Sequence, residues 1–167
     1  MKLYRSKTLE LTQGAIIAAL YVVLTLVFAP ISFGASGGMQ LRVAEALTIL
    51  PMFTTAAIPG LFVGCVIANL LGGAIIWDVI FGSLATLIGA VFSYMLRKNR
   101  WLVPIPAILS NTIIVPFVLK YGYGVDAPIL LLMVYLLVGE IGGCYILGEL
   151  LATVLLPHKN RLFKEDL

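Results

Sequence analysis

The sequence predicts an all-α membrane protein, a six-helix transmembrane bundle that forms a single integral membrane domain over residues 1–167, with both termini cytoplasmic. Of the residues, 61% are hydrophobic and 11% are charged, whereas soluble domains carry about 25% charged residues. A membrane-spanning helix needs about 20 apolar residues, so six such helices leave no room for a soluble domain. Two further observations support this prediction. The basic residues are grouped, and a few ionisable residues lie inside apolar segments.

Most basic residues lie in three groups beside the apolar segments. Residues 2–7, 97–100 and 159–164 hold nine of the 11 lysines and arginines. Lysine and arginine accumulate in cytoplasmic loops, so we expect both termini and the 97–100 loop in the cytoplasm, which requires an even number of crossings. The net charge of +3 reflects this asymmetry and does not indicate nucleic-acid binding.

The helices follow from the apolar segments and their breaks. The first predicted helix ends before Pro30, and a loop rich in glycine and serine follows at residues 31–39. The segment 61–96 is too long for one crossing, so we place a reversal at Trp77 and Asp78, where an aromatic residue suits the interface and an aspartate can cap a helix. A tight turn is expected at residues 58–60. The predicted helices are residues 11–29, 40–57, 61–76, 79–96, 101–119 and 128–156.

The segment QLRVAEALTILP, residues 40–51, places Arg42 and Glu45 in an otherwise apolar helix. At helical spacing the two residues share a face. A charge at the centre of a membrane helix costs about 2.5–3.5 kcal/mol, so such residues tend to face a polar cavity. Pro51 cannot donate to the carbonyl of Leu47 and is expected to bend this helix. A structural ion pair between Arg42 and Glu45 is the alternative interpretation.

Other polar residues are predicted to join Arg42 and Glu45 around one pocket that opens outward. The predicted members are Trp77, Asp78, Tyr121 and Tyr123 in the outer half, and Asn111 and Glu140 at mid-depth. Carboxylates, an amide and aromatic faces suit a planar, nitrogen-rich ligand that is neutral or cationic. A carboxylate can accept two parallel N–H groups from such a ligand. An interfacial anchor is the alternative role for Trp77, and a helix cap is the alternative for Asp78.

The sequence argues against an enzyme and against a resident metal or cofactor. It contains no Gly-Lys-Ser or Gly-Lys-Thr and no HExxH. One histidine and two cysteines do not make a metal cluster. Glu149 lies nine residues after Glu140, half a turn out of phase, so the two cannot serve one site, and we expect Glu149 to pair with a basic cytoplasmic residue or a neighbouring helix instead.

Small residues follow one side of the first predicted helix. They are Gly14, Ala15, Ala18 and Ala19. Strips of this kind let two membrane helices approach closely. From the spacing, the neighbour is either another helix of the same chain or a partner subunit.

With six short spans, both termini inside and an AxxxA strip at Ala15 and Ala19, the chain resembles the S components of energy-coupling factor (ECF) vitamin transporters. The segment LRVAEALTILP resembles the QueT family within that group, and the resemblance covers essentially the whole chain. It implies a substrate-binding subunit in the bacterial plasma membrane. The small-residue strip would dock onto a transmembrane T subunit, and two partner ATPases would use the ATP, so this chain needs no cofactor.

The same resemblance implies a queuosine precursor as the cargo, a deazaguanine such as the aminomethyl form, or queuine. In that reading Glu140 binds the ring edge, Asn111 the ring carbonyl, and Glu45 makes a second polar contact with Arg42 orienting it. Two other functions stay open from the residues. One is a self-sufficient ion-coupled carrier for a small planar nitrogenous metabolite, and the other is a structural membrane subunit without a ligand.

Overall fold

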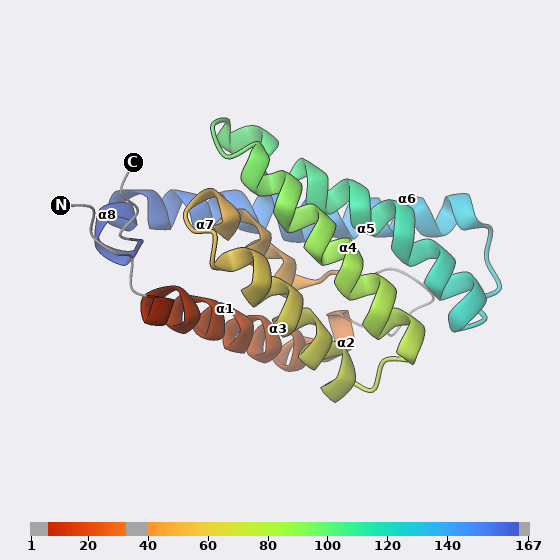
Figure 1. Ribbon diagram of the computed structural model, residues 1–167. Helices are drawn as coiled ribbons and strands as arrows, with labels where there is room; N and C mark the ends of the chain where they lie inside the picture. Colours follow the sequence, from red (N-terminus) through yellow and green to blue (C-terminus); the bar gives the residue numbers. More distant parts are fainter. Residues whose placement is uncertain (1–6, 33–39, 164–167) are drawn as a thin grey trace.

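The computed structural model describes residues 7–32 and 40–163 as a bundle built from helices (Figure 1). In this part of the chain, four helical segments are long and apolar enough to cross a membrane: Lys7–Val27, Ile76–Met95, Arg100–Gly122 and Ile129–His158. Two shorter apolar helices, Val43–Met52 and Ala57–Leu71, lie beside them. The all-α prediction is therefore confirmed. Six crossings and the cytoplasmic position of both termini stay predictions.

The long helices alternate in direction along the bundle. Helix α1 (Lys7–Val27) begins at one end of the bundle. Helix α4 (Ile76–Met95) ends there, and α8 (Lys159–Leu162) lies at the same end (Figure 1). The basic segments at the start of α1, between α4 and α5, and in α8 therefore gather at one end of the bundle. A four-residue helix, α2 (Ala29–Ser32), follows α1 at the opposite end. Most of the predicted loop at 31–39 lies outside the described residues.

The predicted helix at 40–57 is the largest error in the sequence-based assignment. Arg42 is extended (φ −83°, ψ 92°), and the helix that follows, η1 (Val43–Met52), is a 3₁₀ helix. The next helix, α3 (Ala57–Leu71), already contains the turn expected at 58–60. Pro59 is tolerated there because the first backbone N–H groups of a helix have no intrahelical partner.

The reversal before α4 also differs from the prediction. It occupies residues 72–75, where Gly73 adopts a positive φ of 74° that other residues disfavour. Trp77 and Asp78 consequently lie in the first turn of α4. Ile75 is the N-cap and no side chain caps this helix, so Asp78 is not the cap that the sequence suggested. Its side chain is instead buried inside the bundle.

The last two long segments each combine α-helical and π-helical turns. The fifth segment contains η2 (Arg100–Leu102), α5 (Ile105–Phe117) and the π-helical η3 (Val118–Gly122). The sixth contains α6 (Ile129–Glu140), the π-helical η4 (Ile141–Leu147), α7 (Gly148–Leu155) and η5 (Leu156–His158). Pro116 lies inside α5, just before η3, where a lost backbone hydrogen bond favours a change of helix type. π-Helical turns are rare and often mark functional sites.

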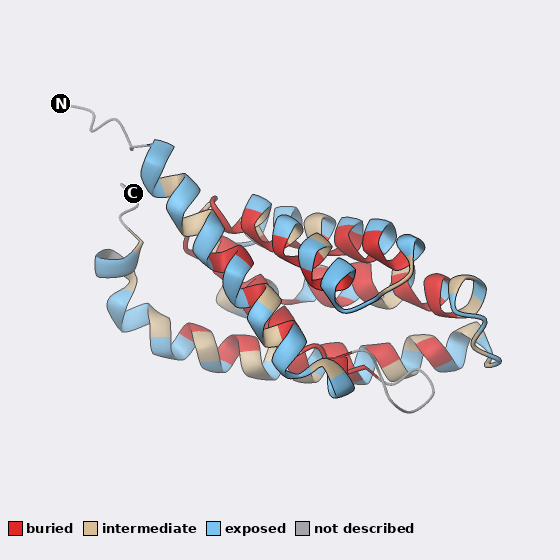
Figure 2. Cartoon of the chain, turned by 90° about the horizontal axis from the view of Figure 1, so that it is seen from below, coloured by how far each residue is buried: buried red, intermediate tan, exposed pale blue. Residues whose placement is uncertain are grey.

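Helix η1 is the centre of the bundle. Its residues from Ala44 to Pro51 are all buried, and it contacts α1, α3, α4, η4 and α7. The buried faces of the surrounding helices point inward toward it, and the exposed faces point outward (Figure 2). Because 3₁₀ helices rarely exceed three or four residues, this ten-residue helix depends on the surrounding helices.

Candidate functional site

Glu45 is the most deeply buried acid of the site. It lies in the first turn of η1 and has no exposed surface. The hydroxyl of Tyr21, from α1, donates a hydrogen bond to Glu45 Oε1 at 2.5 Å. Glu45 Oε2 is buried without a hydrogen-bond partner. A buried polar atom left unpaired costs about 1–3 kcal/mol, so this oxygen is a candidate contact for a ligand.

Arg42 pairs with Asp78 of α4. Arg42 Nη2 and Asp78 Oδ1 lie 3.7 Å apart, with both side chains at most 5% exposed. Neither of these two atoms makes a hydrogen bond. The predicted i, i+3 arrangement of Arg42 and Glu45 on one helical face does not hold, because Arg42 is extended and precedes the helix. Gly82 makes room for the pair, since a Cβ there would lie 2.9 Å from Asp78 Oδ1.

Asp78 also connects this pair to Tyr123, which lies between η3 and α6. The hydroxyl of Tyr123 donates to Asp78 Oδ2 at 3.1 Å and accepts a hydrogen bond from the backbone N–H of Ile75 at 3.3 Å. Burial raises the pKa of Tyr123 to about 12, and the negative charge of Asp78 acts in the same direction. The phenol is therefore protonated, and able to donate, at neutral pH. Asn69 adds a hydrogen bond from its amide to the Asp78 carbonyl at 3.4 Å.

Glu140 and Asn111 complete the cluster from the other side. Glu140 is the last residue of α6, and it accepts a hydrogen bond from the Cys144 thiol at 3.0 Å. One ligand atom from each of Glu45, Glu140 and Cys144 lies within 4.8 Å of the others. The amide of Asn111 interacts with both carboxylates. However, neither its oxygen nor its nitrogen makes a hydrogen bond of normal geometry, although the residue is fully buried.

The glycines beside Glu140 bring the two halves of the cluster together. A Cβ at Gly139 would lie 1.9 Å from the carbonyl oxygen of Gln40, and one at Gly143 would lie 2.7 Å from that of Arg42. The extended segment before η1 therefore packs directly on α6 and η4. Backbone therefore occupies the space beside Gly139 and Gly143.

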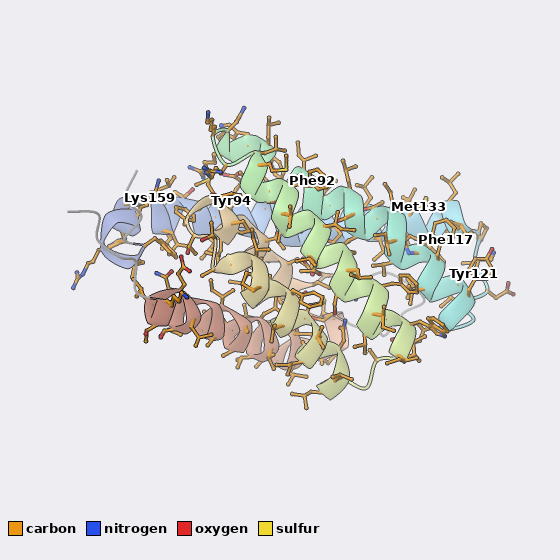
Figure 3. All side chains as sticks on the ribbon, in the orientation of Figure 1. Phe92, Tyr94, Phe117, Tyr121, Met133 and Lys159 are labelled. Carbon is orange, nitrogen blue, oxygen red and sulfur yellow. The ribbon has the colours of Figure 1, made fainter. Side chains whose placement is uncertain are left out.

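Trp77 and Tyr121 do not join this buried cluster. Trp77 is 54% exposed and stacks on Phe81, and Tyr121 is 74% exposed and stacks on Phe117. Both rings line a groove of about 760 Å³ on the outer face of α4 and α5. Phe117 and Tyr121 point away from the bundle interior (Figure 3). Their position is that of aromatic residues facing lipid or the interface.

Several residues of the cluster were not predicted to belong to it. They are Tyr21, Asn69 and Cys144. Tyr123, a predicted member, contacts Asp78 through its hydroxyl. Tyr21 falls within a long apolar helix, and nothing in its local sequence distinguishes it from a core aromatic. Cys144 had a detectable signal, because its spacing of four residues from Glu140 places both on one helical face.

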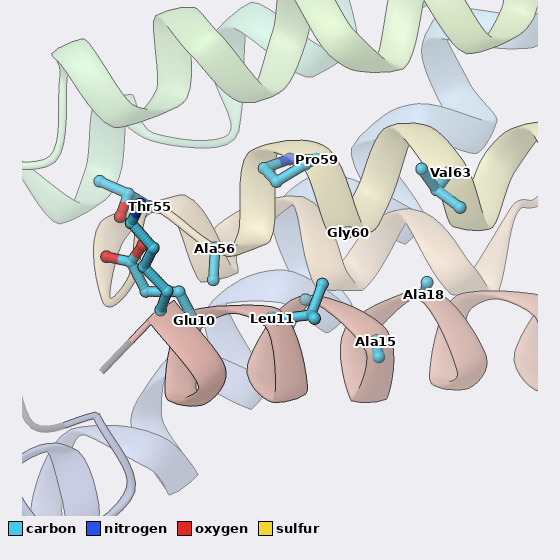
Figure 4. Close-up of a pocket in the computed structure, with 11 residues that line it drawn as sticks. Glu10, Leu11, Ala15, Ala18, Thr55, Ala56, Pro59, Gly60 and Val63 are labelled. Atoms are coloured by element: carbon cyan, nitrogen blue, oxygen red, sulfur yellow. The ribbon is translucent and has the colours of Figure 1, made fainter. Parts of the chain in front are cut away.

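The small residues of α1 divide between two environments. Gly14 and Ala18 pack against α3, where a Cβ at Gly60 would lie 2.7 Å from the Gly14 carbonyl oxygen and one at Gly64 would lie 3.0 Å from Ala18. Ala15 and Ala19 are exposed. A groove of about 620 Å³ runs between the first halves of α1 and α3, with Ala15 on its lining (Figure 4).

Glu149 lies outside the cluster, as predicted. Its carboxylate forms an ion pair with the Nε of Arg100, and Arg100 Nη2 donates to the Glu149 carbonyl at 3.0 Å. Of the two predicted partners for Glu149, a basic residue or a neighbouring helix, the structure shows a basic residue, Arg100.

The charges of the buried cluster are unbalanced. Arg42 is the one base, and the acids are Glu45, Asp78 and Glu140. This set can hold a cationic organic group whose N–H donors satisfy the unpaired oxygens. The cluster contains no histidine, and the Tyr21 and Cys144 hydrogen bonds already engage one oxygen of each glutamate, so we do not assign a metal ion to it.

Comparison with known proteins gives a family match and one partial relative. The family model described as "QueT transporter" matches residues 11–157. The chain is 40% identical over 87 residues to the "Queuosine precursor transporter QueT" of Lactococcus lactis subsp. cremoris (strain MG1363). That alignment covers 50% of this chain, and the chain spans 48% of the length of the relative. No solved structure matches.

Proposed function

This chain belongs to the QueT transporter family, and from that premise we propose that it is the substrate-binding S component of an ECF importer for a queuosine precursor. The family is one of transporters, so the chain is not an enzyme. Its long apolar helices suit a membrane protein, and we propose a bacterial plasma membrane location with six crossings and both termini in the cytoplasm.

One observation carries the ligand proposal. The unpaired buried atoms of Arg42, Glu45, Asp78 and Asn111 belong to one cluster around the start of η1. Leaving several polar atoms unpaired within a few ångströms of each other costs several kcal/mol in total. A ligand with matching donors and acceptors would recover that free energy on binding, which is the property expected of a substrate-binding site.

A deazaguanine with an aminomethyl group, or queuine, has the required groups. Its guanine-like edge presents parallel N–H donors that one carboxylate can accept. Its ring carbonyl can accept from the Asn111 amide, and its ammonium group can bind a second acid. We propose Glu140 for the ring edge and Glu45 for the second polar contact, with Arg42 orienting the site through Asp78.

Calorimetric titration of the purified protein tests this proposal. We expect binding of an aminomethyl-deazaguanine and no binding of adenine, which lacks the same donor edge. Mass spectrometry of the small molecules that co-purify would identify the natural ligand. If no deazaguanine produces heat or a thermal shift, the protein is a structural subunit and the proposal is wrong.

The buried carboxylate pair favours one alternative, a carrier that works alone and uses Glu45 or Glu140 as a proton site. Liposomes that contain only this chain separate the two functions. We expect no uptake without a T subunit and two ATPases. Uptake by the chain alone, abolished by an uncoupler, would establish the carrier and exclude the S component.

For the T subunit, we propose that α1 docks through Ala15 and Ala19, the members of the strip that do not pack on α3. The double variant Ala15→Leu/Ala19→Leu is expected to bind ligand normally and to lose co-purification with the T subunit. Val154→Leu, which adds bulk at a 60% exposed position of α7, is the matched control. Normal assembly of the double variant would exclude this docking face.

A further inference from the structure

We infer that the empty site holds one proton shared by Glu45 and Glu140, and that a cationic ligand displaces this proton when it binds. The inference rests on the proposed function, because it concerns the same site and ligand. It adds a measurable property, proton release on binding, and a selectivity for cationic over neutral deazaguanines. Both follow from the charges around the two glutamates.

The two carboxylates are too close and too buried to carry two uncompensated charges. Glu45 and Glu140 are 0% and 4% exposed, and they have oxygens within 4.8 Å of each other. Like charges at this separation, away from water, repel strongly. One retained proton leaves a single negative charge on the pair and is the simplest way to relieve that repulsion.

No neighbouring group among the described residues offers a second compensating charge. The titratable groups that interact with the pair are Tyr21 from α1, Arg42 before η1, Cys65 from α3 and Cys144 from η4, and Asp78 from α4 lies beside Arg42. Arg42 is the one cation in this set, and Asp78 shares it at 3.7 Å. Tyr21 and Cys144 donate neutral hydrogen bonds, which cannot replace a full charge.

A ligand with an ammonium group changes this balance. Its ring edge needs one ionised carboxylate as the acceptor, and its ammonium needs a second. The shared proton then has no place in the site and leaves to solvent, while the ammonium restores the same total charge. A neutral analogue offers the ring edge alone, so one glutamate keeps the proton.

Calorimetry on the unmodified protein tests the inference. Titrations at the same pH in phosphate and in Tris, whose ionisation enthalpies differ, give the number of protons released from the difference in observed heat. We expect about one proton for the aminomethyl-deazaguanine and none for the analogue with a nitrile in place of the aminomethyl group. Over the pH range in which the free glutamate pair holds one proton, the Kd of the amine should fall about tenfold per pH unit as the pH rises.

Variants then locate the proton. Glu140→Gln and Glu45→Gln each leave a single carboxylate, so the release should disappear, whereas Glu149→Gln should still release about one proton. Amine binding without proton release, or release that persists in both glutamine variants, overturns the inference and leaves the proposed function intact. Failure of every deazaguanine to bind overturns both. If a variant does not fold, the amine and nitrile titrations of the unmodified protein decide the question.

Discussion

Two buried or half-buried arginine–carboxylate pairs lie in different parts of this bundle and are built differently. Arg100 donates to the Glu149 carboxylate, to the Glu149 carbonyl and to the Thr153 hydroxyl, and its side chain is 27% exposed. Arg42 is 5% exposed and lies 3.7 Å from Asp78, with unpaired atoms on both partners. The first pair leaves one buried oxygen, Glu149 Oε1, without a hydrogen-bond partner, whereas the second leaves unpaired atoms on both partners and on the neighbouring Glu45.

The difference separates a structural contact from a binding site. The Arg100 pair joins the basic loop after α4 to α7, and its hydrogen bonds come from the protein itself. The Arg42 pair lies beside Glu45 and Tyr123, and its missing hydrogen bonds match those that a ligand could supply. An ion pair alone does not indicate a binding site, and the distinguishing feature of the Arg42 region is that several residues there have unpaired buried atoms.

Replacing each arginine in turn should give the largest difference between the two pairs, measured as the loss in the free energy of unfolding. Arg42→Met leaves Asp78 as an uncompensated buried charge, which is expected to lower the free energy of unfolding by about 3–5 kcal/mol. Arg100→Met, in the more exposed pair, should cost about 1 kcal/mol or less. Thermal unfolding in detergent measures both. The double variant Arg42→Met/Asp78→Asn should recover much of the loss, and equal destabilisation by the two single variants would contradict the comparison.

Substitutions of the two glutamates of the last long segment should affect ligand affinity differently. Glu140→Gln removes a charge-assisted acceptor worth about 1.5–3 kcal/mol, so the Kd for an aminomethyl-deazaguanine should rise about 10- to 100-fold. Glu149→Gln is the matched control and should leave the Kd unchanged. Isothermal titration gives both values, and unchanged binding by Glu140→Gln would remove this residue from the site.

Tyr123 and Tyr121 should show the smallest difference, in the effect that loss of the hydroxyl has on ligand affinity. Tyr123→Phe loses the hydrogen bond to Asp78, which is worth about 0.5–1.5 kcal/mol, so ligand affinity should fall about 2- to 10-fold. Tyr121→Phe removes a hydroxyl from an exposed ring and should have no effect. Dissociation rates measured with the two variants would sharpen the result, and equal rates would show that the Tyr123–Asp78 hydrogen bond does not hold the ligand in place.

Some of the site could be predicted because buried charge is costly in any fold. Arg42, Glu45, Asp78, Asn111 and Glu140 were singled out as polar residues in apolar segments, and the structure brings them together. Trp77 and Tyr121 were assigned to the same site by composition and depth, but helical phase turns them to the outer face of α4 and α5. Depth alone does not say which way a side chain points.

The amino-acid sequence by itself determined that the chain is an apolar helical protein and which ionisable residues need partners, because hydropathy and charge act through composition and local order. Tertiary structure decided which residues pair with these ionisable side chains. Arg42 pairs with Asp78 because residues 40–42 are extended against the glycines of α6 and η4, a conformation that depends on packing between distant segments. The same packing enforces the 3₁₀ geometry of η1, which no local propensity favours over so many residues.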